Sequence, residues 1–461
     1  MGISYELGQF VEKTGFDDIP AEVIETQKKS VLDNIGNILG ASGIGEGCKG
    51  AVETACTLSA GGAEEATVIG FNKKLPVAWA AFANASMSHS LDYGDSFTEK
   101  GAFHPNASTF PAALAVAEKL NVDGKTFLTS LVLGSEVACR INVANSHKMD
   151  PDGFYPPMIL TSYGATTAVS KLLNLNPQQY CDALSFNLCQ ATCSSELSNN
   201  KKTVIRSIRE SFAAKSAVLS GYLAQNNLKG FDQPLEGKLG FFHTYCHDEW
   251  EEAAVLRNIG TEYKAGKISF KPWPSCLGTH TAIDASLQLV NQYDIKPEEI
   301  ERVHLAISEG NYVLCEPEAV KKAPESGIIA KYSDFYASAL AIIYKNCTLR
   351  DYTPEMFQNE NLKNLMSKYT YEINHEWTRS NGKGLWTEVT IYTKRGEFRK
   401  LCEVPYGASS RPMPYSEVCN KMRDSASMAL HPKTADQLDK IQETVEHLDE
   451  LGSIRELTAL L

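Results

Sequence analysis

The stretch from residue 86 to residue 111 is the richest in side chains that can do acid–base chemistry. It reads SMSHSLDYGDSFTEKGAFHPNASTFP, so acids, two histidines and several hydroxyls lie among glycines and prolines. This composition predicts that a helix gives way to an irregular loop, and loops held by rigid helices often carry catalytic groups. Asp92 can accept a proton as a carboxylate and His104 titrates near neutral pH, so both suit acid–base catalysis. The alternative is a loop whose polar groups only bond one another beneath a domain junction.

Two arginines three residues apart form a second candidate site. Arg206 and Arg209 lie in the stretch 202–217, which reads KTVIRSIRESFAAKSA. On a helix this spacing places both side chains on one face. Guanidinium groups can bind carboxylates through two parallel hydrogen bonds, so the pair suits an acidic ligand. The alternative is an ordinary solvated helix face.

A third candidate site lies in the stretch 269–285, which reads SFKPWPSCLGTHTAIDA. Lys271 is followed by two prolines that stiffen its backbone, and it lies where we expect a domain boundary. Its ammonium group can hold a carboxylate or protonate an intermediate. His280 begins a predicted helix, where backbone N–H groups favour anions. The alternative for His280 is a histidine that only satisfies its own helix terminus.

The elements that position these residues are mostly helices. A first long helix is expected after Pro20, with Gly40 as its end. Small residues at the density seen further along let helices pack closely. The alanine-rich segments are 76–117, 125–142, 164–173 and 204–225. Helical spacing returns over 416–461, whose apolar stripe is expected to dock on the first domain.

The pattern changes near residue 271. Residues 302–308 alternate as a strand does, and 386–404 read as a hairpin that turns at residues 394–396. A helix over 280–293 lies between them. The prediction is a mainly α protein with an inserted α+β domain at 269–404 and an all-helical domain formed by 1–268 and 405–461.

Composition narrows the classes of partner. A net charge of -12 over 461 residues argues against a nucleic-acid or anionic-membrane binder, so an acidic ligand would need a local cluster of cations. No apolar stretch looks long enough to cross a bilayer, so no membrane partner is expected. Twelve scattered cysteines and an N-terminus without a signal-peptide pattern predict a cytoplasmic protein with reduced thiols.

Three other patterns are interpreted as structural. The glycine-rich stretch 40–47 follows a helix rather than a strand, so we interpret it as a linker and not as a nucleotide loop. His243 and His247 could bind zinc from one helical turn, but no third ligand has a suitable spacing, so no metal site is predicted. Ser211 and Ser216 lack a nucleophile-elbow pattern, which gives no support for a hydrolase.

The 86–111 motif resembles that of the MmgE/PrpD family, which includes 2-methylcitrate dehydratases, cis-aconitate decarboxylases and related epimerases. The family stretch runs Asp-aromatic-Asp-Asp-Thr and then His-Pro-Ser. This chain has DYGDS at 92–96 and HPN at 104–106. The resemblance implies that Asp92, Ser96 and His104 line the active site. Ser96 keeps the hydroxyl of the usual threonine, whereas Gly94 replaces an acid.

The other candidate sites also resemble family motifs, with departures. Lys271 and His280 fall in a Lys-Pro-x-Pro-x-Cys…His pattern, whereas Arg206 and Arg209 replace the lysine and histidine of a Lys-x-x-His pattern. Arginine is suited to binding rather than to proton transfer. Tyr155 stands where the family has the histidine of Gly-Phe-His-Pro, and a phenol with an ordinary pKa near 10 is a poor base at neutral pH.

The resemblance spans essentially the whole chain. It implies a large helical domain, a smaller lid domain, a homodimer, no cofactor, and a small di- or tricarboxylate substrate. Asp92 or His104 would remove a proton alpha to a carboxylate, and Arg206 or Lys271 would stabilise the resulting charge. The other member of the Asp92–His104 pair, or Tyr155, would assist loss of hydroxide. Arg209, Ser96 and His280 would bind substrate.

The residues leave the type of reaction open. Dehydration is the first expectation, and decarboxylation or epimerisation could use the same carbanion-type intermediate. Two other classes are a metal-dependent lyase built on His243 and His247, and a non-catalytic protein that binds polycarboxylates.

Overall fold

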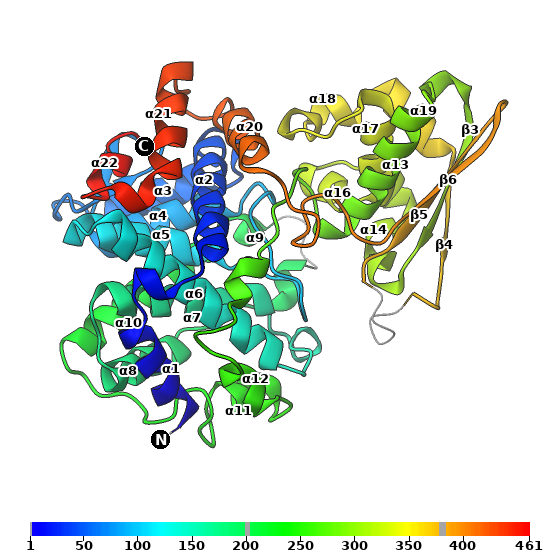
Figure 1. Cartoon of the computed structure of the whole chain (residues 1–461). Coiled ribbons are helices and arrows are strands. Elements are labelled where there is room, and N and C mark those ends of the chain that lie inside the picture. The colour runs from blue at the N-terminus through cyan, green and yellow to red at the C-terminus, as the bar shows by residue number, and fades with distance from the viewer. Residues whose placement is uncertain (1, 199–202, 378–383) are drawn as a thin grey trace. The chain divides into compact units, whose positions relative to one another are not determined.

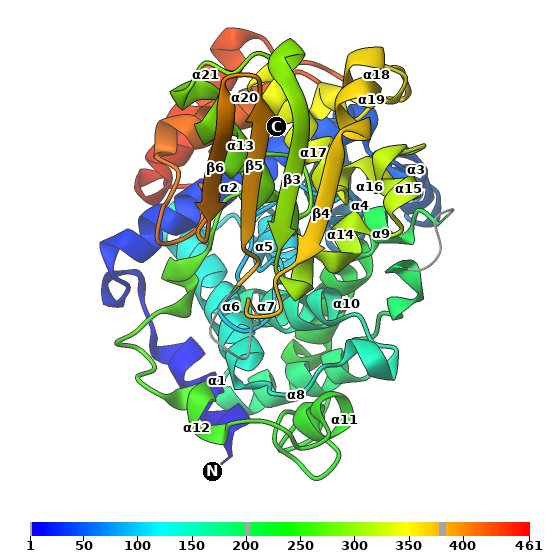
Figure 2. The same ribbon diagram turned by 90° about the vertical axis from the view of Figure 1, so that its right-hand side faces the viewer.

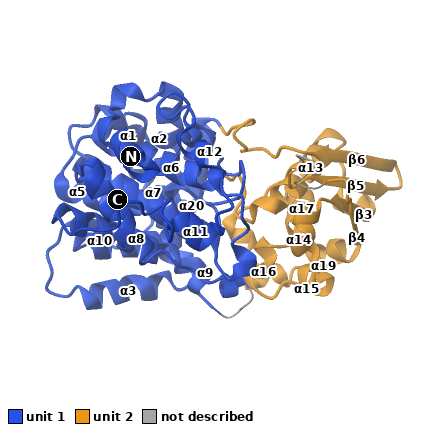
Figure 3. Cartoon of the chain, turned by 90° about the horizontal axis from the view of Figure 1, so that it is seen from below, with its two compact units in different colours: residues 1–270, 414–461 blue, residues 271–413 orange. Residues whose placement is uncertain are grey.

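The computed structural model describes residues 2–198, 203–377 and 384–461. The chain forms two compact units (Figure 3). Unit 1 contains Met1–Phe270 together with Pro414–Leu461, and unit 2 is the continuous segment Lys271–Met413. The described residues are mainly helical, as the sequence predicts.

Unit 1 is a bundle of helices in which α7 packs against α5, α6 and α10 (Figure 1). Its helices before residue 271 are α1 Ile3–Lys13, α2 Ala21–Ile44, α3 Cys48–Leu58, α4 Val77–Ser88, α5 Asn106–Leu120, α6 Gly124–Ala144, α7 Pro156–Leu172, α8 Pro177–Leu188, α9 Ile205–Ile208, α10 Glu210–Gln225, α11 Phe241–Cys246 and α12 Glu252–Leu256. A small antiparallel pair, β1 Ala66–Val68 and β2 Lys73–Leu75, was not predicted from the sequence.

The C-terminal part of the chain returns to unit 1 as α20 Tyr415–Ala426, α21 Ala435–Glu446 and α22 Arg455–Thr458. The apolar stripe predicted in this region spans α21, a 3-10 turn and α22 rather than a single helix. It docks on unit 1 as expected: the backbone N–H of Ile454 donates to the carbonyl of Val122, and that of Gly124 donates to the carbonyl of Leu451.

The predicted end of the first long helix at Gly40 is wrong. Helix α2 continues to Ile44 and so includes the first part of the stretch interpreted as a linker. The glycines of α2 serve close packing instead: a Cβ on Gly40 would lie 2.7 Å from the Ser425 carbonyl oxygen, and one on Gly36 would lie 2.8 Å from the Met422 Cα. The α20 backbone therefore approaches α2 more closely than any larger residue would allow.

Helix α6 has the length and mean hydropathy of a membrane-spanning helix. Its most apolar window is 94% buried inside the protein, as in a core helix. Glu136 and Arg140 form an ion pair on this helix, with 2.6 Å between Oε1 and Nε, and both side chains are fully buried.

Unit 2 is built on a four-stranded sheet with the order β4-β3-β5-β6 (Figure 2). Strand β3 Ile300–Ile307 pairs in parallel with β4 Tyr369–Ile373 and antiparallel with β5 Thr387–Thr393, which continues into β6 Gly396–Cys402. Helices α13 His280–Gln292 and α17 Asp334–Tyr344 pack together on one face of the sheet and enclose an apolar core. The shorter helices are α14 Tyr312–Cys315, α15 Glu318–Lys322, α16 Gly327–Lys331, α18 Pro354–Phe357 and α19 Glu360–Ser367.

The sequence-based predictions for unit 2 are confirmed at three elements. The strand at 302–308, the hairpin at 386–404 and the helix at 280–293 correspond to β3, the β5–β6 pair and α13. Strand β4 was missed.

Candidate active site

The loop predicted to follow a helix near residue 88 connects α4 to α5 and spans residues 89–105. Two buried phenylalanines anchor it: Phe97 and Phe103 form a backbone bridge and pack edge to face, with ring centroids 5.9 Å apart. Ser96 also pairs with Ser269 through two backbone hydrogen bonds of 2.9 and 2.7 Å. The loop is irregular in backbone but held firmly, which is what a set of catalytic side chains requires.

His104 is oriented by the loop itself. Its Nδ1 lies 2.8 Å from the Asp95 carbonyl oxygen and 3.2 Å from the Ser96 hydroxyl. Because a carbonyl oxygen can only accept, the contact with Asp95 places the proton of the neutral ring on Nδ1. The basic nitrogen is then Nε2, so the loop sets His104 in the tautomer that can accept or return a proton there.

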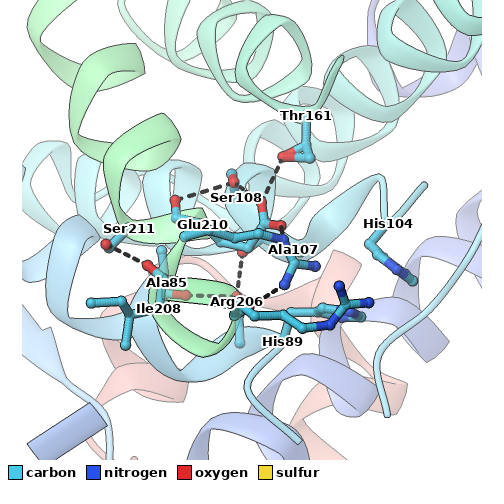
Figure 4. Close-up of polar contacts among 12 residues, drawn as sticks. Ala85, His89, His104, Ala107, Ser108, Thr161, Arg206, Ile208, Glu210 and Ser211 are labelled. Carbon is cyan, nitrogen blue, oxygen red and sulfur yellow. Dashed lines mark hydrogen bonds and ion pairs between the residues drawn. The ribbon is translucent and has the colours of Figure 1, made fainter. Parts of the chain in front are cut away.

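His89 stacks on His104 and was missed as a candidate from the sequence. The centroids of the two rings, both labelled in Figure 4, are 3.7 Å apart. His89 Nε2 lies 3.6 Å from Asp92 Oδ1. Two stacked imidazoles disfavour simultaneous protonation because their charges repel, so a proton on one ring lowers the affinity of the other. His89 occurs three residues before Asp92, at the end of α4, and that spacing was the only sequence signal for it.

Asp92 adopts a left-handed backbone conformation, with φ of 54°, and it is 7% exposed. This conformation is uncommon outside glycine and tends to occur where the fold must aim a side chain. Gly94 leaves room for the histidine pair: a Cβ at this position would lie 3.3 Å from His89 Nδ1. The substitution of glycine for the family's usual acid therefore lets the loop pass close to the His89 ring.

The loop itself contains a buried acid, Asp95. Asp95 accepts a hydrogen bond of 2.6 Å from Asn106 Nδ2. Burial and the charge of Asp33 together raise the pKa of the Asp95 carboxyl to about 7, although hydrogen bonds from Asn106 and Ser30 act to lower it. Asp33 itself pairs with Lys421 of α20, whose Nζ also donates to the Tyr93 carbonyl oxygen in the loop. Helix α20 thus supports the loop directly.

Tyr155, Arg206 and Arg209 lie together. The Cζ atoms of Arg209 and Arg206 lie 5.2 and 5.9 Å from the centroid of the Tyr155 ring. Arg206 belongs to α9, whereas Arg209 lies at the junction of α9 and α10, so the two do not share the face of one continuous helix. A tyrosine ring beneath two guanidiniums orients cations by cation–π attraction. This gives Tyr155 a role in positioning that does not require it to act as a base.

Glu210 accompanies this group and was not predicted. Its carboxylate is fully buried and accepts a hydrogen bond of 2.7 Å from the Ser108 hydroxyl, with Thr161 Oγ1 3.4 Å away (Figure 4). Arg209 Nε lies 3.1 Å from Glu210 Oε1. Arg209 therefore neutralises a buried acid, whereas Arg206 is only partly buried.

Lys271 and His280 are close together in unit 2. The Lys271 ammonium donates to the Ser275 carbonyl oxygen at 3.1 Å, and the Ser275 hydroxyl lies 2.7 Å from that of Thr279, the N-cap of α13. The Trp273 ring packs edge to face on His280, with centroids 5.3 Å apart. The prolines after Lys271 thus lead into a tight turn that ends at the first residue of α13, as predicted.

The structure groups the eight predicted residues into three sets. Asp92, Ser96 and His104 share the 89–105 loop, Tyr155 joins the two arginines, and Lys271 joins His280. The pair His243 and His247, considered as zinc ligands, does not converge. His243 Nδ1 bonds Asp248 at 2.7 Å, whereas His247 Nε2 lies 3.1 Å from Asp152 Oδ2.

Comparison with known proteins identifies the family. A model of the MmgE/PrpD N-terminal domain matches residues 5–253, and a model of the MmgE/PrpD C-terminal domain matches residues 273–447. The chain belongs to the MmgE/PrpD family. The resemblance inferred from the motifs is confirmed. The family's C-terminal match extends through unit 2 into α20 and α21 of unit 1.

Several named MmgE/PrpD relatives align over most of the chain. Cis-aconitate decarboxylase of Mus musculus is 26% identical over 83% of this chain and 79% of its own length. Cis-aconitate decarboxylase of Aspergillus terreus is 24% identical over 100% of this chain and 96% of its own. A probable 2-methylcitrate dehydratase of Saccharomyces cerevisiae is 25% identical over 72% of this chain and 68% of its own.

Proposed function

We propose that this protein is a lyase that acts on a small di- or tricarboxylate through a carbanion-type intermediate. The observation that carries the proposal is the stacked His89–His104 pair beside Asp92, in a buried loop that sets the tautomer of His104. These three groups can exchange a proton with a carbon atom and with one another. The relatives named as a decarboxylase and a dehydratase are both lyases, which supports the same class of reaction.

Cations are assigned to the substrate carboxylates. The chain carries a net charge of -12, so an acidic substrate must be held by local positive groups. We assign this role first to Arg206, which is partly buried and lies over the Tyr155 ring. Lys271 is assigned to stabilise the negative charge that develops on the substrate during the reaction.

Decarboxylation of a cis-aconitate-like substrate is our first candidate reaction. A carboxylate leaves as carbon dioxide, its bonding electrons remain on carbon, and the protonated His104 returns a proton to that carbon. A proton from solvent, passed on by Asp92 or His89, then restores the proton on His104, so the proton consumed in each turnover is replaced. The relatives named as cis-aconitate decarboxylases support this order because they match 83% and 100% of the chain.

Dehydration, which the motifs placed first, is the second candidate. Here one group removes a proton alpha to a carboxylate and another protonates the leaving hydroxide, so two groups in opposite protonation states are needed. The His89–His104 pair and Asp92 could divide these two roles between them. The probable 2-methylcitrate dehydratase that matches 72% of the chain supports it.

The test is an NMR assay of the metal-stripped protein in heavy water with cis-aconitate, citrate, 2-methylcitrate and related hydroxydicarboxylates. Loss of a carboxyl carbon would identify a decarboxylase, a new alkene from a hydroxy acid would identify a dehydratase, and inverted stereochemistry would identify an epimerase. Deuterium at the reacting carbon would establish the carbanion.

The first prediction concerns His104. We expect His104→Gln to lower kcat by about 10²-fold or more, since general acid–base groups contribute about 10²–10⁴-fold. His375→Gln is the matched control, because His375 is exposed and pairs with Glu309 in unit 2. If substrates raise the Tm of the wild-type protein but none is exchanged or converted, the protein is a polycarboxylate-binding member of the family and not a lyase.

A further inference from the structure

A cluster of two histidines and an aspartate lies in unit 1 and is not used by the proposed reaction. His147 and His247 both direct Nε2 at the same atom, Oδ2 of Asp152, at 2.5 and 3.1 Å. The two imidazole rings lie 4.6 Å apart, centroid to centroid. If one ligand atom is taken from each of the three residues, these atoms all lie within 4.8 Å of one another.

We propose that His147, Asp152 and His247 form a zinc-class metal site. Two imidazole nitrogens and one carboxylate oxygen are a ligand set that Zn²⁺ and the neighbouring transition metals prefer, whereas Mg²⁺ and Ca²⁺ favour oxygen ligands throughout. Three protein ligands leave a fourth tetrahedral position for water. A divalent ion would take the place of the direct contacts that both rings now make with the carboxylate.

The cluster also has a partner outside the ligand set. Glu249 Oε2 lies 3.4 Å from Nδ1 of His147, the nitrogen that does not face Asp152. Histidines that bind a metal characteristically donate their other N–H to a carboxylate or carbonyl, which sets the tautomer and strengthens the ligand. Glu249 is placed to do this for His147.

Backbone pairing holds the two halves of the cluster in register. Ser146 N–H donates to the Glu249 carbonyl oxygen and Glu251 N–H donates to that of Ala144, both at 2.9 Å. These bonds join the segment after α6 to the segment before α12. His247 has a left-handed backbone conformation, with φ of 51°, which ends α11 and turns its side chain away from His243.

The side chains can adjust to an ion and can be reached by one. Ligand atoms about 2 Å from a tetrahedral zinc are about 3.3 Å apart, so the closest pair must open by about 1 Å. The side chains of His147, Asp152 and His247 are 18%, 32% and 55% exposed, which leaves them free to turn. An ion bound here would link the 147–152 segment to the end of α11. The 147–152 segment ends three residues before Tyr155.

The test is direct zinc binding by the untagged full-length protein, measured by calorimetric titration with Zn²⁺ alone and by the shift in Tm. We expect one zinc per chain, loss of that zinc in His147→Ala and His247→Ala, and binding about 10-fold to 100-fold weaker in Glu249→Gln. His243→Ala is the matched control, because His243 lies in the same turn but bonds Asp248.

Circular dichroism without metal checks that each variant is folded, and Asp152→Asn gives a third ligand variant if one alanine variant is not. The proposal is overturned if the wild type takes up no zinc, or if its zinc is retained in His247→Ala, as it would be if cysteines bound the ion. It is also overturned if His243→Ala loses zinc as fully as His247→Ala does.

Discussion

Protonation of one buried carboxyl group, that of Asp95, affects the stability of the folded protein. Burial and the nearby charge of Asp33 raise the pKa of its carboxyl from 3.8 to about 7 in the folded protein. The folded state therefore binds this proton more tightly than the unfolded state does. The stabilisation is complete below pH 4 and is lost as pH rises towards 7, by at most about 1.4 kcal/mol per pH unit.

The Asp95→Asn variant should not lose stability as pH rises from 4 to 7, because its amide keeps an acceptor for Asn106 and does not ionise. The Tm of the wild type, relative to that of the variant, should fall between pH 4 and pH 7 and then level off. Thermal unfolding measured across this range checks the prediction. Parallel curves would show that Asp95 titrates normally in the folded protein.

Substitutions of the two arginines over Tyr155 are expected to have different effects. One should lower stability, and the other should weaken substrate binding. Arg209→Ala leaves Glu210 as a buried acid without its ion pair, so we expect a loss of about 3–5 kcal/mol in the free energy of unfolding. Arg206→Ala should change stability little and raise KM for the polycarboxylate about 10-fold or more. Urea unfolding and steady-state kinetics on both variants check this, and equal stability losses would contradict it.

Residue type and the resemblance to the family motif made Asp92 and His104 candidates. Neither pointed to His89 or Glu210. The stack of His89 on His104 depends on how α4 ends and on the room left by Gly94. Glu210 reads as a solvated helix residue until the fold places Ser108 and Arg209 around it.

At the scale of elements, the close contact between α2 and α20 should make a Gly→Ala substitution in α2 destabilising, although such a substitution usually stabilises a helix. Gly40→Ala would place a Cβ 2.7 Å from the Ser425 carbonyl oxygen, so we expect a loss of about 1–3 kcal/mol from overpacking. Gly50→Ala in the exposed part of α3 is the matched control. It meets no atom within 4 Å and should gain about 1 kcal/mol from helix propensity. Chemical unfolding of both variants is the measurement, and a stabilised Gly40→Ala would contradict the packing argument.

Elements whose contacts are local in sequence were predictable, whereas elements that depend on distant contacts were not. The β5–β6 hairpin is local, so its alternation and its turn at Gly396 suffice to predict it. Strand β4 has only five residues and pairs in parallel with β3, which is distant in sequence, so no local turn indicates it. Gly40 was misread as a helix end because the reason for it lies in α20.

At the scale of the whole molecule, unit 1 is completed by the returning segment 414–461. This segment supplies Lys421, which pairs with the buried Asp33 and bonds the Tyr93 carbonyl oxygen. Unit 2 is continuous and has its own apolar core. A chain truncated after Met413 should therefore keep the unfolding transition of unit 2 and lose that of unit 1.

Differential scanning calorimetry of the truncated chain checks this expectation, and the full-length Lys421→Met variant provides a milder comparison. In that variant Asp33 loses its partner beside Asp95, so unit 1 should be weakened by about 3–5 kcal/mol but still fold. An unchanged transition of unit 1 after truncation would contradict the role assigned to the returning segment.

The return of α20 to unit 1 also sets an order of events at the ribosome. Segment 271–413 emerges as one uninterrupted piece and can form its sheet while synthesis continues. The loop that bears Asp92 and His104 is translated earlier, but the hydrogen bond from Lys421 to it cannot form until α20 has been synthesised. A nascent or prematurely terminated chain therefore carries every predicted catalytic residue and still lacks the finished loop, so we expect the proposed activity only after translation has passed α20.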